Sequence, residues 1–172
     1  MDLPTPILQK VAKKKLALDP GLEYLLFFGL IRFYKGLDLL IKSLPELRQK
    51  KPNTRLLVVG ESYELMRKYR KLAISLMVND MVFFHDHFVP KMQIPLWFGA
   101  CDWVIQPYKS ATQSGITPMA IYYAKPSVVT DVGSLSDGIT AKTGLVCKPN
   151  PTALYQTINR ALTEKEQFSD IK

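Results

Sequence analysis

Six short apolar runs alternate along this chain with segments that carry apolar residues at helical spacing. Runs of this continuous kind form strands that are buried on both faces of a sheet. A helix between consecutive strands is typical of parallel pairing. The sequence therefore predicts an α/β fold, a Rossmann-like doubly wound parallel sheet of about six strands. The expected strands are Glu23–Phe28, Arg55–Val59, Met81–Phe84, Asp102–Ile105, Ser127–Thr130 and Gly144–Cys147.

The intervening segments predict the helices and the division of the chain. With 172 residues, the chain has room for one domain with a core of its own. We expect a lead-in helix and linker over 1–20, ending before the turn signal Asp19-Pro20-Gly21, and one domain over 21–172. Pro45 falls inside the second helical pattern and is expected to kink it. That helix begins at Leu37 and is expected to end at Pro52-Asn53, and the other expected helices are Glu64–Met77, Met92–Ala100, Ile116–Ala124 and Pro151–Leu162.

The charge of the chain is unevenly distributed. Residues 1–71 contain fifteen Lys or Arg against seven Asp or Glu, whereas residues 72–172 contain eight of each. A basic half indicates an anionic partner, which is a phosphate, a nucleic acid or an acidic membrane surface. Most of these cations are expected on solvated helix faces, as at Lys13–Lys15 and Arg67–Lys71.

Cysteine usage and the apolar runs bear on location. Cys101 and Cys147 lie far apart without a CxxC spacing, so reduced, buried thiols in a cytoplasmic protein are expected, with one long-range disulfide as the alternative. No apolar signal core follows Met1. The longest apolar run, Tyr24–Ile31, is too short to cross a bilayer.

Parallel sheets bind ligands where strands end and helices begin, so the loops at 29–36, 60–63, 85–90, 106–115 and 131–138 are candidates. In the first of them, Arg32 and Lys35 follow Gly29 and precede a helix. Arginine grips phosphate oxygens in a bidentate way and lysine adds a point charge, which suits a diphosphate. Two surface cations on a solvated turn are an equally good interpretation of these residues alone.

The loop 106–115 is polar and ends at a predicted helix. Thr112, Gln113, Ser114, Gly115 and Ile116 could present free backbone N–H groups to an anion, helped by the helix dipole. The alternative is a simple N-cap by Ser114 or Thr112.

Other chemistry is absent from the sequence. His85-Asp86-His87 could place two imidazoles on one face, but these are the only histidines and no further ligand set completes a zinc site, so no metal is expected. The chain has no P-loop, no GxGxxG and no nucleophile elbow. Its aromatic residues fall mostly on strand and helix core positions, which argues against a nucleic-acid-binding surface.

Several blocks, in this order, resemble the donor-binding domain of the family-4 (group 1) retaining glycosyltransferases of GT-B fold. The resemblance runs from about Leu22 to Leu162. Its blocks are Phe28-Gly29, 35–41, Leu57–Gly60, Ala100–Asp102, 106–108, Ala124–Gly133, Lys142–Leu145 and Pro149.

The resemblance implies a nucleotide-diphosphate sugar as donor, transfer with retention, and no metal cofactor. It implies that Lys35 contacts the diphosphate together with an arginine, and we assign that role to Arg32, although the family's arginine would stand at Leu30. Donor binding is further assigned to Gly29, Gly60, Phe88, Val89, Thr112, Gln113, Ser114, Gly115 and Ile116.

Two positions depart from the family pattern. The family has glutamates eight positions apart, one for a sugar hydroxyl and one for the ribose, and those positions are Ala111 and Met119 here. Neither side chain can make the contact. Gln113 and Thr112 could partly replace the first glutamate, whereas the second has no evident substitute.

The resemblance therefore predicts half of a GT-B enzyme, a hexosyltransferase type acting on a glycan or lipid-linked acceptor in cell-surface polysaccharide synthesis. The N-terminal acceptor domain is absent from these residues, so we expect an excised donor domain or a natural remnant that is inactive alone. Expected partners are the nucleotide sugar, that acceptor domain and an anionic inner membrane surface. The alternatives are a degenerate binding or scaffold module of the same fold and a basic nucleic-acid-binding protein.

Overall fold

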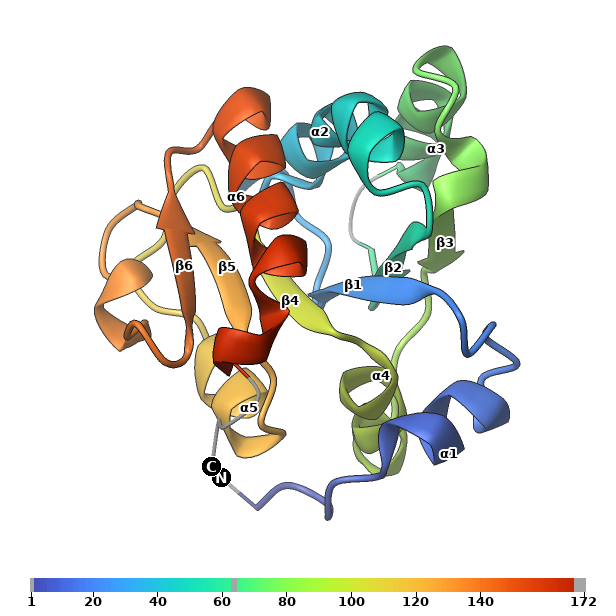
Figure 1. Ribbon diagram of the computed structural model, residues 1–172, viewed down its shortest axis with the longest axis vertical. Helices are drawn as coiled ribbons and strands as arrows, with labels where there is room; N and C mark the ends of the chain where they lie inside the picture. The colour runs from blue at the N-terminus through green and yellow to red at the C-terminus, as the bar shows by residue number, and fades with distance from the viewer. Residues whose placement is uncertain (1, 63–64, 169–172) are drawn as a thin grey trace.

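A computed structural model describes residues 2–62 and 65–168 and confirms the predicted fold (Figure 1). Six parallel strands form one sheet in the order β3-β2-β1-β4-β5-β6. Because the chain starts in the middle of the sheet and winds outward in both directions, the two halves diverge at β1 and β4. The strands are β1 Glu23–Phe28, β2 Thr54–Val59, β3 Val82–His85, β4 Trp103–Gln106, β5 Ser127–Thr130 and β6 Gly144–Cys147.

Helices cover both faces of this sheet. In Figure 1, α2, α3 and α6 lie on one side, and α1, α4 and α5 lie on the other. The α-helices are α1 Gln9–Lys15, α2 Leu37–Lys50, α3 Met66–Ser75, α4 Ile94–Ala100, α5 Ile116–Tyr122 and α6 Pro151–Thr163. Short 3-10 helices are η1 Phe33–Lys35, η2 Asn79–Met81, η3 Lys91–Gln93, η4 Ser136–Gly138 and η5 Lys165–Phe168.

The strands divide their side chains between two cores. Successive residues of a strand point to opposite faces, so Leu25 and Phe27 of β1 join the core under α2, α3 and α6. Tyr24, Leu26 and Phe28 join the core under α4 and α5. Both faces are buried, which explains why the strands lack a polar alternation in the sequence.

The lead-in segment differs from its prediction. Its helix spans Gln9–Lys15 rather than most of residues 1–20, because Pro4 and Pro6 disfavour helical backbone in the residues before them. The predicted turn is confirmed, since the Gly21 N–H donates to the Asp19 carboxylate at 2.8 Å. The segment packs on α4, and the Gln9 amide donates to Asp102 at 3.0 Å.

The remaining helix boundaries lie close to their predictions. Helix α2 continues through Pro45 to Lys50, so the proline does not end it. Helix α3 begins at Met66, and the predicted start at Glu64 lies outside the described residues. The 3-10 turn η1 was not predicted, since a three-residue element has no periodicity of its own.

The loops after β1 and β4 pack tightly together at the point where the sheet diverges. Gly36 adopts φ +70°, and a Cβ there would lie 1.9 Å from the Pro107 carbonyl oxygen. Across the same contact, the Lys109 N–H donates to the Tyr34 carbonyl at 2.7 Å, and the Lys109 ammonium pairs with Asp38 at 2.8 Å. This contact holds the cation-bearing loop in register with the polar loop.

Gly36→Ala is therefore expected to destabilise the fold by roughly 2–4 kcal/mol, because the new methyl group meets backbone and the left-handed conformation is strained. Urea unfolding followed by circular dichroism measures this loss. Gly115→Ala is the matched control, since Gly115 has φ −69° and open space around its Cβ position. That control should raise the free energy of unfolding by roughly 0.4–1 kcal/mol. Equal losses of stability in the two variants would contradict the packing argument.

Candidate functional site

Lys35 is the centre of the candidate site. It ends η1 and its side chain folds back to the carboxyl end of β1, where Gly29 leaves room for it. The ammonium lies 3.2 Å from the position that a Cβ on Gly29 would take, and the Ile116 side chain lies 3.3 Å from that same position. A cation from the first loop therefore stands beside the start of α5, in the crevice between β1 and β4.

The environment of Lys35 is unfavourable for its charge. The residue is 8% exposed. Burial, followed by the nearby Arg32 charge, lowers the pKa of Lys35 from 10.5 to about 8. Among residues 2–62 and 65–168, no carboxylate forms an ion pair with it. A buried cation in this state gains free energy from any anion that enters the crevice.

Tyr108 provides one wall around this cation. The Lys35 ammonium lies 5.5 Å from the centre of the Tyr108 ring, within reach of a cation–π contact. The ring is buried, and burial raises the pKa of Tyr108 to about 12. The phenol therefore stays neutral, and it does not compensate the lysine charge.

Beside Lys35, a hollow of about 180 Å³ lies at the carboxyl ends of β1 and β2. It brings together four residues that the sequence assigned to donor binding: Gly29, Gly60, Phe88 and Val89. Gly60 has φ +140°, and a Cβ there would lie 2.1 Å from the Gly29 carbonyl oxygen, so the two strand ends approach closely. Sequence reasoning missed Glu61 in this hollow, although it is the first polar residue after β2.

The polar loop before α5 is held by a network of side chains. The Ser114 hydroxyl donates to the Gln106 amide oxygen at 2.7 Å, and it accepts the Ile116 N–H at 3.1 Å. The Gln106 amide nitrogen donates to the Thr117 hydroxyl at 3.1 Å. The N-cap residue of α5 is Gly115 rather than the predicted Ser114 or Thr112, and it makes no side-chain capping bond. The Ser114 hydroxyl nevertheless occupies the Ile116 N–H, which is therefore no longer a donor for an anion.

The other predicted residues of that loop do not all gather at Lys35. Gln113 and Ser114 line a different hollow, of about 270 Å³, on the side of α5 that faces Leu135. Thr112 and Gly115 are exposed in the same loop. Of the five predicted residues, Ile116 is the one whose side chain reaches Gly29.

The two positions that lack the family glutamates are packed rather than open. Met119 is buried in the core under α4 and α5, in the same cluster as Phe28 and Ile116. Ala111 is partly buried against Tyr108, and its carbonyl oxygen would meet a Cβ on Gly133 at 1.7 Å. Neither position offers a hydrogen-bonding side chain to the crevice.

Within the part of the chain that the structure describes, no three His, Cys, Asp or Glu side chains gather as a metal site. His85 and His87 meet edge to face at 5.5 Å, and His85 also contacts Trp97. Cys101 and Cys147 are buried and unpaired. No helix in the described residues has the length and apolar character needed to cross a membrane.

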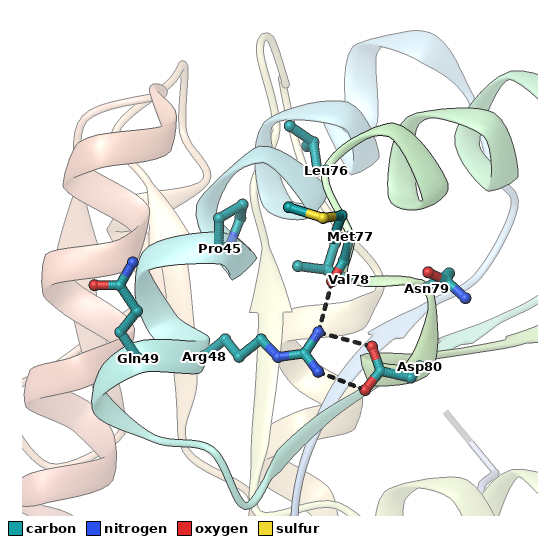
Figure 2. Close-up of a pocket in the computed structure, with 8 residues that line it drawn as sticks. All are labelled: Pro45, Arg48, Gln49, Leu76, Met77, Val78, Asn79 and Asp80. Atoms are coloured by element: carbon teal, nitrogen blue, oxygen red, sulfur yellow. Dashed lines mark hydrogen bonds and ion pairs between the residues drawn. The ribbon is translucent and has the colours of Figure 1, made fainter.

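Another hollow, of about 610 Å³, lies at the opposite end of the sheet. Figure 2 shows Arg48 of α2 reaching Asp80, with which it forms two hydrogen bonds of 2.8 Å, and the Met77 carbonyl. Because its two charges neutralise each other, this hollow is a weaker candidate for an anion site than the crevice at Lys35.

Comparison with known proteins places the chain in a family. The sequence model described as "Glycosyl transferases group 1" matches residues 9–172. The chain belongs to the group 1 glycosyltransferases. This confirms the resemblance that was drawn from the ordered sequence blocks.

Among curated relatives of this glycosyltransferase chain is the D-inositol 3-phosphate glycosyltransferase of Pseudarthrobacter chlorophenolicus, 34% identical over 83% of the chain and 34% of the relative. Two solved structures share its fold. WaaG, involved in lipopolysaccharide biosynthesis, has a TM-score of 0.86 at 24% identity, covering 98% of this chain and 45% of WaaG. Anabaena Alr3699/HepE in complex with UDP-glucose has a TM-score of 0.82 at 19% identity, and the match covers 98% of this chain and 46% of HepE. The chain thus spans less than half of these proteins.

Burying the Lys35 charge costs folding free energy, so Lys35→Met is expected to stabilise this glycosyltransferase chain at pH 7. The lowered pKa of Lys35 corresponds to a gain of about 3 kcal/mol. Below pH 8 both the folded and unfolded states keep the proton, so the wild type bears the full cost. Between pH 8 and 10.5 the folded state loses the proton first. Wild-type stability therefore rises with pH, and the advantage of the variant shrinks.

Urea unfolding of both proteins from pH 7 to 10.5 measures this difference. Lys148→Met removes an exposed lysine and should leave the pH dependence of stability unchanged. A Lys35→Met variant that is less stable than the wild type at pH 7 would show that the ammonium has a stabilising partner.

Proposed function

We propose that this chain is the donor-binding half of a retaining glycosyltransferase and holds a nucleotide-diphosphate sugar in the crevice between β1 and β4. The observation that carries the proposal is Lys35, a buried cation with a lowered pKa and no carboxylate partner among the described residues. A diphosphate is the ligand that best relieves it, because each charge-assisted hydrogen bond to a phosphate oxygen restores what burial removes.

In the proposed reaction, an acceptor oxygen replaces the diphosphate oxygen at the anomeric carbon, and the configuration there is retained. Negative charge develops on the leaving diphosphate as its bond to the sugar breaks. Lys35 and Arg32 would stabilise that charge, which is the largest electrostatic contribution available to this half of the enzyme. The start of α5 would contribute less to binding the diphosphate than the sequence suggested, since the Ser114 hydroxyl already accepts the Ile116 N–H.

The hollow beside Lys35 would receive the nucleoside. Gly29 and Gly60 allow a ligand to approach the backbone closely, and the Phe88 ring, 70% exposed, is available to pack on a base. With Met119 buried, we assign the acceptance of ribose hydroxyl hydrogen bonds to Glu61, the carboxylate in this hollow. No divalent metal enters the proposal, because lysine and arginine supply the positive charge.

The names of similar proteins suggest where to begin with substrates. HepE was solved with UDP-glucose, so UDP-glucose is the first donor to test, followed by GDP and ADP sugars. WaaG acts in lipopolysaccharide biosynthesis, which supports a glycan or lipid-linked acceptor in cell-surface polysaccharide synthesis. Buried, unpaired cysteines favour a reducing compartment, and we place the protein in the cytoplasm.

A second candidate function is a binding or scaffold module that has lost transfer. It is favoured by Ala111 and Met119, which replace both family glutamates with side chains that cannot hold a sugar or ribose hydroxyl. This module would still bind a nucleotide diphosphate through Lys35, so donor binding alone does not separate the two functions.

Lys35→Ala is expected to weaken UDP-glucose binding by roughly 1.5–3 kcal/mol, the scale of a charge-assisted hydrogen bond. Isothermal titration calorimetry measures the affinity, and the same wild-type affinity is expected with and without a chelator. Because Lys35 of the free protein titrates near pH 8, wild-type affinity should fall as the pH rises above that value. The variant should lack this pH dependence.

Lys50→Ala provides the control for net charge, since Lys50 is exposed at the end of α2, away from the crevice. Its affinity and pH profile should match those of the wild type. Unchanged binding in Lys35→Ala would disprove the assignment, and binding that vanishes with chelator and returns with Mn²⁺ would disprove the metal-free proposal.

The isolated chain is expected to bind donor without transferring sugar, and fusion to an N-terminal acceptor domain of the family should restore transfer. Positioning an acceptor hydroxyl against the anomeric carbon can supply roughly 7–11 kcal/mol of the barrier, and in this proposal the acceptor domain supplies that positioning. A product assay with one donor tests both proteins. Robust turnover by the isolated chain would refute the argument, and inactivity of both would favour the scaffold module.

A further inference from the structure

Helix α3 has a composition that the proposed donor site does not explain. Its ten residues, Met66–Ser75, include four cations and no acidic residue. Met66, Tyr69 and Ala73 face the core, so the cations lie on the outside. Figure 1 shows α3 on the outer side of the molecule, on the face of the sheet that α2 and α6 also cover.

Most carboxylates near α3 are already neutralised. Asp86 pairs with Arg70 at 3.2 Å, Asp80 pairs with Arg48 at 2.8 Å, and Asp38 pairs with Lys109. Arg67 and Lys71 are exposed and have no ion-pair partner among residues 2–62 and 65–168. The charge of this surface is therefore positive and available to an anionic partner.

Large apolar side chains are exposed around the same helix. Leu65, just before α3, is 81% exposed, Ile74 is 61% exposed, and Met77, just after the helix, is 78% exposed. Exposed apolar side chains and nearby cations supply the two contributions to binding at a membrane interface, which are apolar burial and attraction to anionic lipid. The aromatic ring of α3 itself, Tyr69, is buried, whereas a surface for single-stranded nucleic acid would carry several exposed rings for base stacking.

A hollow of about 290 Å³ adjoins α3 on the side of the crevice. Its lining includes Lys42 of α2, Lys68, Tyr69 and Leu72 of α3, and Phe33 of the Lys35 loop. The Lys68 ammonium lies 4.8 Å from the Tyr69 ring centre, and Asp38, the acidic residue in the wall, is paired with Lys109. Two cations beside apolar side chains suit a phosphate group that carries a hydrocarbon chain.

We propose that α3 and this adjoining hollow form a docking surface for an anionic phospholipid membrane. Arg67 and Lys71 would contact lipid phosphates while Leu65, Ile74 and Met77 enter the interface. The hollow would take one lipid headgroup between Lys42 and Lys68. Because Phe33 belongs to both the hollow and the loop of Lys35, docking would set the crevice beside the membrane surface. The inference does not depend on donor binding.

Sedimentation with phospholipid vesicles tests this surface in the absence of any nucleotide sugar. The chain should bind vesicles of equal parts phosphatidylglycerol and phosphatidylcholine but not vesicles of phosphatidylcholine alone. Each basic residue near an anionic surface strengthens binding about fivefold, so Arg67→Glu with Lys71→Glu should weaken it at least about twentyfold. Circular dichroism should show that the variant keeps its fold.

The matched control is Lys14→Glu with Lys15→Glu, which makes the same change of net charge on α1, across the sheet. This control should keep most of the binding. The proposal is overturned if the wild type ignores anionic vesicles, if the α3 variant binds as the wild type does, or if the α1 variant loses as much.

A second readout locates the contact. An environment-sensitive fluorophore on Ile74→Cys should shift to shorter wavelength when phosphatidylglycerol vesicles are added. The same label on Ile121→Cys, an exposed position of α5 on the other side of the sheet, should not shift. The native thiols are both buried, which keeps the label at the introduced site. A shift at Ile121 without one at Ile74 would place the membrane contact elsewhere.

Discussion

The unsatisfied charge of Lys35 is the constraint around which the crevice is built. A buried ammonium is costly, and the surrounding fold supplies what is needed to keep it there. Gly29 leaves the space, Tyr108 supplies an aromatic face, and the contact of Gly36 with Pro107 fixes the loop that carries it. The proposed diphosphate would offset this cost, since binding sites commonly give up stability for function.

The fold was predictable because the decisive signals are local. Continuous apolar runs mark strands buried on both faces, and β5 and β6 were predicted with their observed bounds. The start of α1 at Gln9 was not predicted, because the helical spacing of apolar residues continues upstream across Pro4 and Pro6. In that segment the backbone restriction outweighs the apolar pattern.

The site was predictable only in part, because tertiary packing decides which strand ends meet. Position after a strand and before a helix marked Lys35 as a candidate, and the structure places its ammonium beside Gly29. Burial lowers the pKa of Lys35, and no pattern in the sequence indicates that a lysine is buried. The network of Gln106, Ser114 and Thr117 was invisible for the same reason, since its members come from β4, the following loop and α5.

The departures at Ala111 and Met119 have a structural meaning beyond the loss of two carboxylates. A charged side chain at 119 would lie among Phe28, Val89 and Ile116, and its burial without a partner would be unfavourable. Met119 instead forms part of that apolar core. Glu61 is the polar side chain that lines the hollow at the carboxyl ends of β1 and β2. In the proposed function, donor selection would therefore depend more on shape and on diphosphate charge than on hydroxyl recognition.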